Sequence, residues 1–223
     1  MCVRLRCCVP LWSFLLALPL SAGVLYDNGP IKGTSGVGIA SWIQGTHNEW
    51  YMAADSFTLS ANSSITGVIF GAEFYTGDSG LTVDWAITTT PFGPALAQGT
   101  ANLSGTFLLA IPAYDMVAWS ESFSISPVRL GAGTYWLQLS NCMTVNYNWA
   151  YWDMNRGTSV AYQKYQYQDP SGLYPGQGQL PYSESFQILG SVPEPGSLML
   201  ISSGVLLLAI RHFRSRAGRV SCG

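Results

Sequence analysis

The sequence predicts a mainly β protein built as a single antiparallel β-sandwich of jelly-roll type. Three observations favour this class. Short runs of alternating residues are rich in Val, Ile, Thr and aromatic side chains, which suit a half-buried pleated surface. Clusters of Gly, Pro, Asn and Ser separate these runs and favour turns. Helical periodicity is almost absent between Leu25 and Leu189.

Seven runs are the clearest strand candidates, and turn signals at 61–64, 76–80, 91–94 and 170–172 divide them. The spacing predicts roughly eight to ten strands in all, and it leaves a barrel and the strand order open. The seven runs are 55–60, 65–75, 81–89, 115–125, 133–140, 159–168 and 184–190.

The chain is expected to have three parts: a signal peptide at 1–23, a sandwich at 24–190 and a tail at 191–223. Arg4 and Arg6 precede an apolar stretch, Val9–Leu20, and small residues follow it, as signal peptidase requires. The alternative is an uncleaved anchor, but the stretch is shorter than the roughly 20 residues that span a bilayer.

Charge and cysteine content limit what the body can be. Residues 24–190 hold eleven acidic and four basic residues, a net charge of −7. This balance argues against nucleic-acid binding, which needs a positive surface. Cys142 is the one cysteine of the body, so we expect no internal disulfide and a fold held by its core.

The tail has three segments in a fixed order. Val192, Pro193, Glu194 and Pro195 form an extended segment, and 196–210 is uncharged and apolar. As a helix, 196–210 spans about 22 Å, short of the roughly 30 Å hydrocarbon core. Arginines that favour a cytoplasmic C-terminus follow it: Arg211, Arg214, Arg216 and Arg219. A plain single-pass anchor is the alternative interpretation.

The stretch "VPEPGSLMLISSGVLLLAIRHFRSR" resembles the PEP-CTERM sorting signal of exopolysaccharide-producing Gram-negative bacteria. The resemblance implies processing by exosortase after transient inner-membrane anchoring, and then delivery to the cell surface or extracellular matrix. One departure is the extension "AGRVSCG" after Arg216. The body is more loosely similar to uncharacterised extracellular sandwiches found before such tails, through "LYDNGP", "DSFTLS", "LGAGTYWLQLS" and "ESFQILG".

Catalytic motifs are sparse in the body. His47 is its one histidine, no Gly-x-Ser-x-Gly motif is evident, and a zinc site of several histidines or cysteines is excluded by count. A glycosidase needs only two carboxylates, and four glutamates are available: Glu49, Glu73, Glu121 and Glu184. We expect no catalytic residues and no enzyme activity, with a secreted glycan-active enzyme as an alternative.

Aromatic residues give carbohydrate binding more support, because flat rings suit the apolar faces of sugars. The body carries seven Trp and twelve Tyr, dense in "NYNWAYWDMNRG" and "YQKYQYQ". If both runs are strands, alternation places the candidate rings on shared faces: Tyr147, Trp149 and Tyr151, then Tyr165 and Tyr167. The alternative is that these rings belong to the core, as aromatics in sandwiches usually do.

A structural calcium ion is the one cofactor considered. Asp27 and Asp55 could supply oxygens, but Ca²⁺ takes six to eight of them and no Asp-x-Asp-x-Asp loop is present. Asp27-Asn28-Gly29 is also a good turn sequence, so we expect no cofactor. The sequence as a whole favours an exported, non-enzymatic structural or interaction protein of the cell surface or exopolysaccharide matrix. A lectin-like carbohydrate-binding module is the alternative.

Overall fold

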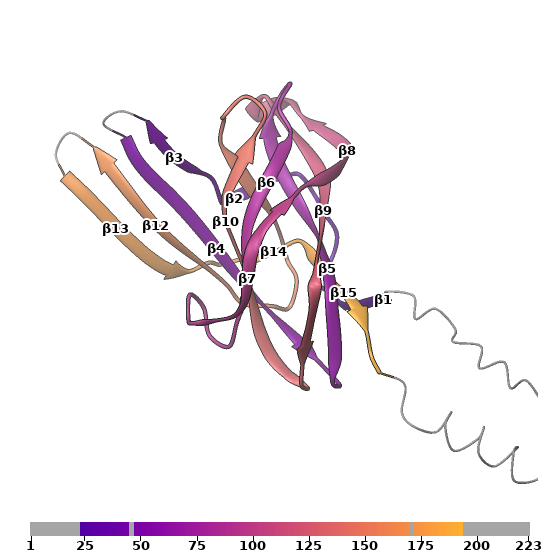
Figure 1. Cartoon of the computed structure of the whole chain (residues 1–223). Helices are drawn as coiled ribbons and strands as arrows, with labels where there is room; N and C mark the ends of the chain where they lie inside the picture. Colours follow the sequence, from indigo (N-terminus) through magenta and orange to yellow (C-terminus); the bar gives the residue numbers. More distant parts are fainter. Residues whose placement is uncertain (1–22, 45–46, 170–171, 194–223) are drawn as a thin grey trace, which may run out of the picture.

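The computed structural model describes residues 23–44, 47–169 and 172–193 (Figure 1). The following parts lie outside these residues: the expected signal peptide apart from Gly23, which begins β1, then Glu194 and Pro195, the apolar tail segment and the tail arginines. Fifteen strands form two antiparallel sheets, which confirms the predicted sandwich. The fifteen exceed the roughly eight to ten expected. No helix in the described ranges is long and apolar enough to cross a membrane.

One sheet has eight strands, and β5 is its central member. Along one side β5 pairs with β9, and along the other with β15 and then β11. Beyond β9 lies β8. The strands are β1 (Gly23–Asp27), β2 (Gly36–Gly38), β5 (Ser63–Tyr75), β8 (Ser104–Ile111), β9 (Met116–Leu130), β11 (Ala150–Asn155), β14 (Ser183–Glu184) and β15 (Phe186–Ser191). A short 3₁₀ helix, η1 (Pro112–Tyr114), joins β8 to β9.

The other sheet has seven strands in the order β13-β12-β4-β10-β6-β7, with β3 beside β4. Its strands are β3 (Ser41–Gln44), β4 (His47–Leu59), β6 (Gly80–Thr88), β7 (Ala95–Asn102), β10 (Gly133–Thr144), β12 (Ala161–Asp169) and β13 (Gly172–Gln179). The ends of β4, β12 and β13 extend beyond the rest of the sandwich (Figure 1).

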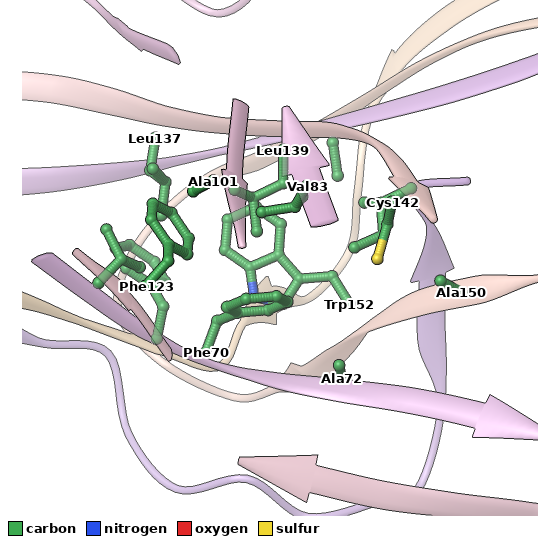
Figure 2. Packing of buried hydrophobic residues seen from close by; sticks show 14 of the residues in the cluster. Phe70, Ala72, Val83, Ala101, Phe123, Leu137, Leu139, Cys142, Ala150 and Trp152 are labelled. Atoms are coloured by element: carbon green, nitrogen blue, oxygen red, sulfur yellow. The ribbon is translucent and has the colours of Figure 1, made fainter. Parts of the chain in front are cut away.

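The core forms where the alternating apolar residues of both sheets meet. Trp152 of β11 is its largest fully buried side chain. Its ring lies 6.2 Å from Phe70 and 5.6 Å from Phe186, centroid to centroid, in edge-to-face geometry. Figure 2 shows the indole above Phe70, directed toward Val83 and Leu139 of the other sheet. Its Nε1–H donates to the Ser185 carbonyl at 3.0 Å, so the buried polar atom is satisfied.

This core is contained within the sandwich. Its fully buried members run from Val37 to Ile188, and Cys142 is among them as a buried free thiol. A domain with its own core can fold without its flanking segments. We therefore use residues 24–190 as an independent unit in the experiments below.

Two buried carboxyl groups meet beside this core. Asp55 of β4 and Glu184 of β14 have no exposed surface. Asp55 Oδ2 accepts hydrogen bonds from the Glu184 N–H at 2.6 Å and from Asn28 Nδ2 at 3.2 Å. Both carboxyl oxygens of Glu184 lack a hydrogen-bond partner. Burial, and next the charge of Asp55, raise the pKa of Glu184 well above its usual range, so this side chain is held neutral.

A third acidic side chain, Glu121 of β9, points into the sandwich and is only 1% exposed. Burial raises its pKa to about 7, although the Gly80 N–H stabilises the ionised form. Burial also raises the pKa of Asp55 to about 6. The pKa of Glu73 is also raised, because the side chain is buried and lies near Asp153. The folded state therefore binds protons at these carboxyl groups more tightly than the unfolded chain does.

Replacing Trp152 with alanine is expected to lower the free energy of unfolding by about 3–5 kcal/mol, because it leaves a cavity in the core and removes the indole hydrogen bond to the Ser185 carbonyl. Chemical denaturation of the 24–190 fragment measures this change. Tyr114→Ala, at a side chain that is 64% exposed, is the control and should change it by less than about 1 kcal/mol. Equal losses from the two variants would contradict the assignment of Trp152 to the core.

The buried carboxyls also predict how stability depends on pH. A folded-state pKa raised above the unfolded value of about 4 means that the folded state binds more protons. Stability is then greatest below about pH 4 and falls as the unfolded-state groups ionise, through the pKa values of about 6 and 7 for Asp55 and Glu121. The melting temperature should fall between pH 5 and pH 8.

Glu121→Gln removes one of these titrating groups while keeping its shape, so it should flatten this fall. Asp115→Asn, at an exposed side chain, should leave the slope unchanged. A melting temperature that rises between pH 5 and pH 8 would show that Asp55 and Glu121 do not have raised pKa values.

Candidate functional site

The outward face of the seven-stranded sheet carries an ordered array of polar and aromatic side chains. In β4 and β10 the residues Ala53 and Leu139 point into the core, so their neighbours Met52 and Ser140 point outward. Strand register extends this face across five strands. One row is Lys164, Met52, Ser140, Asp84 and Thr100, and the next is Tyr162, Ala54, Gln138, Ala86 and Gln98. We call this face, together with Trp50 and Trp136, the polar platform.

A hollow of about 360 Å³ lies in the platform where β10, β6 and β7 meet. The small residue Ala86 keeps its floor low. Most of its lining is polar and can donate or accept hydrogen bonds. The side chains concerned are Asp84, Gln98, Thr100, Gln138 and Ser140.

Neighbouring side chains hold the polar groups of the hollow in place. The Asp84 carboxylate accepts hydrogen bonds from Thr100 Oγ1 at 2.5 Å and from Asn141 Nδ2 at 3.0 Å. Gln138 Nε2 donates to Thr88 Oγ1 at 3.0 Å and is buried. Both groups are therefore oriented before any ligand arrives, which lowers the entropic cost of binding.

Aromatic rings border the platform on the side away from β7. Trp136 of β10 and Tyr162 of β12 are half-buried and meet edge to face, with ring centroids 5.4 Å apart. Further along the same face, Lys164 Nζ lies 5.8 Å from the centroid of the Trp50 ring, within cation–π range. The platform thus combines ring surface, hydrogen-bonding groups and a shaped hollow.

The aromatic residues that the sequence singled out do not form this array. Tyr147 and Trp149 precede β11, so the expected single strand face with Tyr151 is wrong. Tyr147 has φ +58° in a turn and is 76% exposed. Trp149 packs edge to face on Tyr51 at 5.2 Å. Tyr151 lies on the eight-stranded sheet and packs against the cluster of Ile111, Met116 and Ala118.

The second aromatic run is placed on β12. Tyr165 stacks on Tyr51, its register partner in β4, with centroids 6.0 Å apart. Alternation places Tyr165 on the face opposite Tyr162, so it lies off the platform. Tyr167 pairs with Tyr174 through the backbone, and its side chain lies outside the described part.

Sequence reasoning missed Trp136, Gln138 and Asp84 because none of them lies in a dense aromatic run, and in the run "YQKYQYQ" it selected Tyr165 and Tyr167 rather than Tyr162. A signal was nevertheless present in "GTYWLQLS", where Trp136 and Gln138 alternate with the apolar Leu137 and Leu139. Alternation shows that such residues face away from the core. It does not show which strands stand side by side, and so the array could not be assembled from sequence.

Both calcium candidates accept hydrogen bonds from other residues of the fold. Asp27 Oδ1 accepts from the Gly29 N–H at 2.8 Å, the expected turn, and its Oδ2 accepts from Gln187. Asp55 is buried, and its oxygens accept from Asn28, Ser56 and Glu184. Among the described residues, no group of three or more His, Cys, Asp or Glu side chains is arranged to hold a metal ion.

The candidate glutamates of a glycosidase are placed away from the platform. Glu73, Glu121 and Glu184 are buried, in β5, β9 and β14. Glu49 is also largely buried, at 7% exposure, in β4. None of the four lines the hollow between β10, β6 and β7.

The tail begins where the last strand ends. Strand β15 pairs with β5 as far as Ser191, and Val192 and Pro193 leave the sheet exposed. Comparison with known families matches residues 191–215 to the PEP-CTERM protein-sorting motif. Comparisons with curated proteins and with solved structures gave no match.

The motif supports recognition by exosortase, export, and membrane-associated sorting before display at the cell surface. The matched range contains the tail residues from Val192 to Arg214, whereas Arg216 and Arg219, also identified in the sequence analysis, lie beyond it. The chain therefore carries a PEP-CTERM sorting motif, which starts at the end of the last strand of an antiparallel β-sandwich.

Proposed function

We propose that this protein is a non-enzymatic interaction protein of the cell surface or exopolysaccharide matrix, and that its sandwich binds polysaccharide on the polar platform. The observation that carries the binding role is the hollow lined by Asp84, Gln98 and Gln138 beside the Trp136–Tyr162 pair. The export route follows from the sorting motif at 191–215. The exopolysaccharide matrix as destination is part of the proposal.

The chemistry of the platform suits a sugar polymer. Sugar hydroxyls need both donors and acceptors, and the amides of Gln98 and Gln138 supply both, while the Asp84 carboxylate is a strong acceptor. The rings of Trp136 and Tyr162 offer flat apolar surface for the C–H faces of a sugar. From β12 to β7 the platform crosses four strand spacings, about 19 Å, which fits an oligosaccharide segment better than a single ring.

The charges on the platform favour a neutral polymer. The Lys164 ammonium and the Asp84 carboxylate stand on β12 and β6, three strand spacings or about 14 Å apart. Neither sign therefore dominates the face. An acidic chain that reached the hollow would meet the Asp84 carboxylate, and this contact is unfavourable.

Binding is tested with the 24–190 fragment on an array of neutral and acidic polysaccharides. Trp136→Ala and Asp84→Asn should each weaken binding of the preferred polymer about tenfold, through lost ring contact and a lost charged acceptor. Tyr147→Ala is the matched control, since it removes an exposed ring outside the platform. Circular dichroism spectra of all variants establish that the fold is retained.

Two results would overturn the platform as the binding site. Binding lost in Tyr147→Ala and kept in Trp136→Ala would place the site on the turn before β11. Absence of binding across the array would leave a structural role without polysaccharide recognition. Polysaccharide cleavage that disappears in a Glu→Gln variant would instead identify an enzyme.

The sorting route is tested in the full chain. Replacing Pro193, Glu194 and Pro195 with alanine should leave the protein unprocessed in the membrane fraction, because the recognition segment is lost. Immunoblots of membrane, surface and medium fractions measure this distribution. Val220→Ala with Ser221→Ala, outside the matched range, is the control and should be processed normally. Unchanged processing of the triple variant would make the tail a plain anchor.

A further inference from the structure

The two sheets end in neighbouring free edges. In the described residues β7 pairs only with β6, and β8 pairs only with β9. A single residue, Leu103, joins β7 to β8, so the chain passes directly from the edge of one sheet to the edge of the other. Figure 1 shows these two strands following one another in magenta. Both edges therefore lie along one side of the sandwich.

This side lacks the charges and prolines that commonly protect an edge strand. The thirty residues from Trp85 to Tyr114 contain no Asp, Glu, Lys, Arg or His. Neither β7 nor β8 contains proline. Edge strands commonly use charges or proline to prevent pairing with another chain. The edges at the other side have such residues, Asp27 in β1 and Pro175 in β13.

Strand β8 is also the more apolar of the two free edges. It reads Ser-Gly-Thr-Phe-Leu-Leu-Ala-Ile, and all of it except Ile111 is exposed. Phe107 remains 51% exposed although its ring lies edge to face with Trp119, with ring centroids 6.1 Å apart. Leu108 and Leu109 are 44% and 36% exposed. Exposed apolar side chains that gather on one element indicate an interaction surface.

An apolar hollow lies beside this strand. It has a volume of about 320 Å³ on the eight-stranded sheet, and Leu108, Pro30, Ile31 and Ile69 contribute to its lining. Apolar side chains of an approaching chain could be buried here next to the exposed strand. The exposed edge of β8 and this apolar hollow are therefore adjacent, because Leu108 belongs to both.

We propose that β8 pairs antiparallel with β8 of a second copy of this chain, which joins the two eight-stranded sheets across a twofold axis. The absence of charge on this side permits this partner. The body holds eleven acidic and four basic residues and remains acidic even with Glu73, Glu121 and Glu184 protonated, so two copies repel each other in most orientations. An approach along the uncharged β7–β8 side keeps the acidic groups apart. A strand that pairs with its own copy about a twofold axis satisfies both edges with one contact.

One irregularity limits the pairing. The register between β8 and β9 shifts between Phe107 and Leu109, so Leu108 is a bulge. Bulges bend a strand, and regular pairing with the second copy is therefore expected on one side of Leu108. On the other side of Leu108, the contact between the two copies is expected to depend on apolar side chains rather than on backbone hydrogen bonds.

The dimer would present two polar platforms. This consequence rests on the proposed function, because two platforms on one particle raise the apparent affinity for a polymer only if each binds it. Dimerisation itself does not depend on polysaccharide.

Sedimentation velocity of the 24–190 fragment tests the pairing without any ligand. The expected result is a concentration-dependent dimer, and Leu108→Lys should reduce the apparent mass twofold by placing like charges at the contact. Val24→Lys is the matched control, since Val24 is 55% exposed on β1 at the other side and its change should leave the dimer intact. A dimer that survives Leu108→Lys, or a wild-type fragment that is monomeric at every concentration, would overturn the proposal.

Cysteine substitutions along β8 give a second, direct readout. Under mild oxidation Ser104→Cys, Thr106→Cys or Leu109→Cys should form a disulfide-linked dimer in at least one position near the twofold axis. Cys142 is buried and does not compete. Val24→Cys should remain monomeric on non-reducing gels. Cross-linking through Val24→Cys with none through β8 would assign the contact to the opposite edge.

Discussion

The two-residue alternation of strands β4, β6 and β10 is the constraint on which the rest of the molecule depends. One set of their side chains, among them Ala53, Val83 and Leu139, packs against the other sheet. The intervening set forms the polar platform. A shift of one residue in any of these strands would exchange the two sets, burying polar groups and exposing the core. Core packing therefore holds the platform in register.

The interior adds a second constraint, because burial raises the pKa values of several of its acidic groups. Glu184 has no exposed surface and no hydrogen-bond partner for its carboxyl oxygens. Ionising such a group inside a protein is costly. The neighbouring Asp55 is instead fixed by donors from Asn28 and the Glu184 backbone. The same sandwich is thus acidic outside and uncharged in part of its interior.

Much of the fold could be predicted from local pattern. The run at 65–75 became β5 (Ser63–Tyr75), and the run at 81–89 became β6 (Gly80–Thr88), because alternation and β-branched residues mark them. Strand β7 was missed because Ala95–Asn102 is rich in Ala, Gly and Asn, which have low strand propensity. It forms a strand because it pairs with β6 along nearly its whole length. Tertiary pairing overrides propensity there.

The sorting motif is local, and so the sequence by itself determined it. Recognition of 191–215 depends on the order of residues along the chain. The class of fold was also determined locally, through alternation and turn residues. Only the tertiary structure decided which side chains share a surface. Trp136, Asp84 and Tyr162 lie on three strands far apart in sequence and become neighbours through the order β12-β4-β10-β6. Strand order depends on long-range packing of two sheets, and a pattern with a period of two residues carries no information about it.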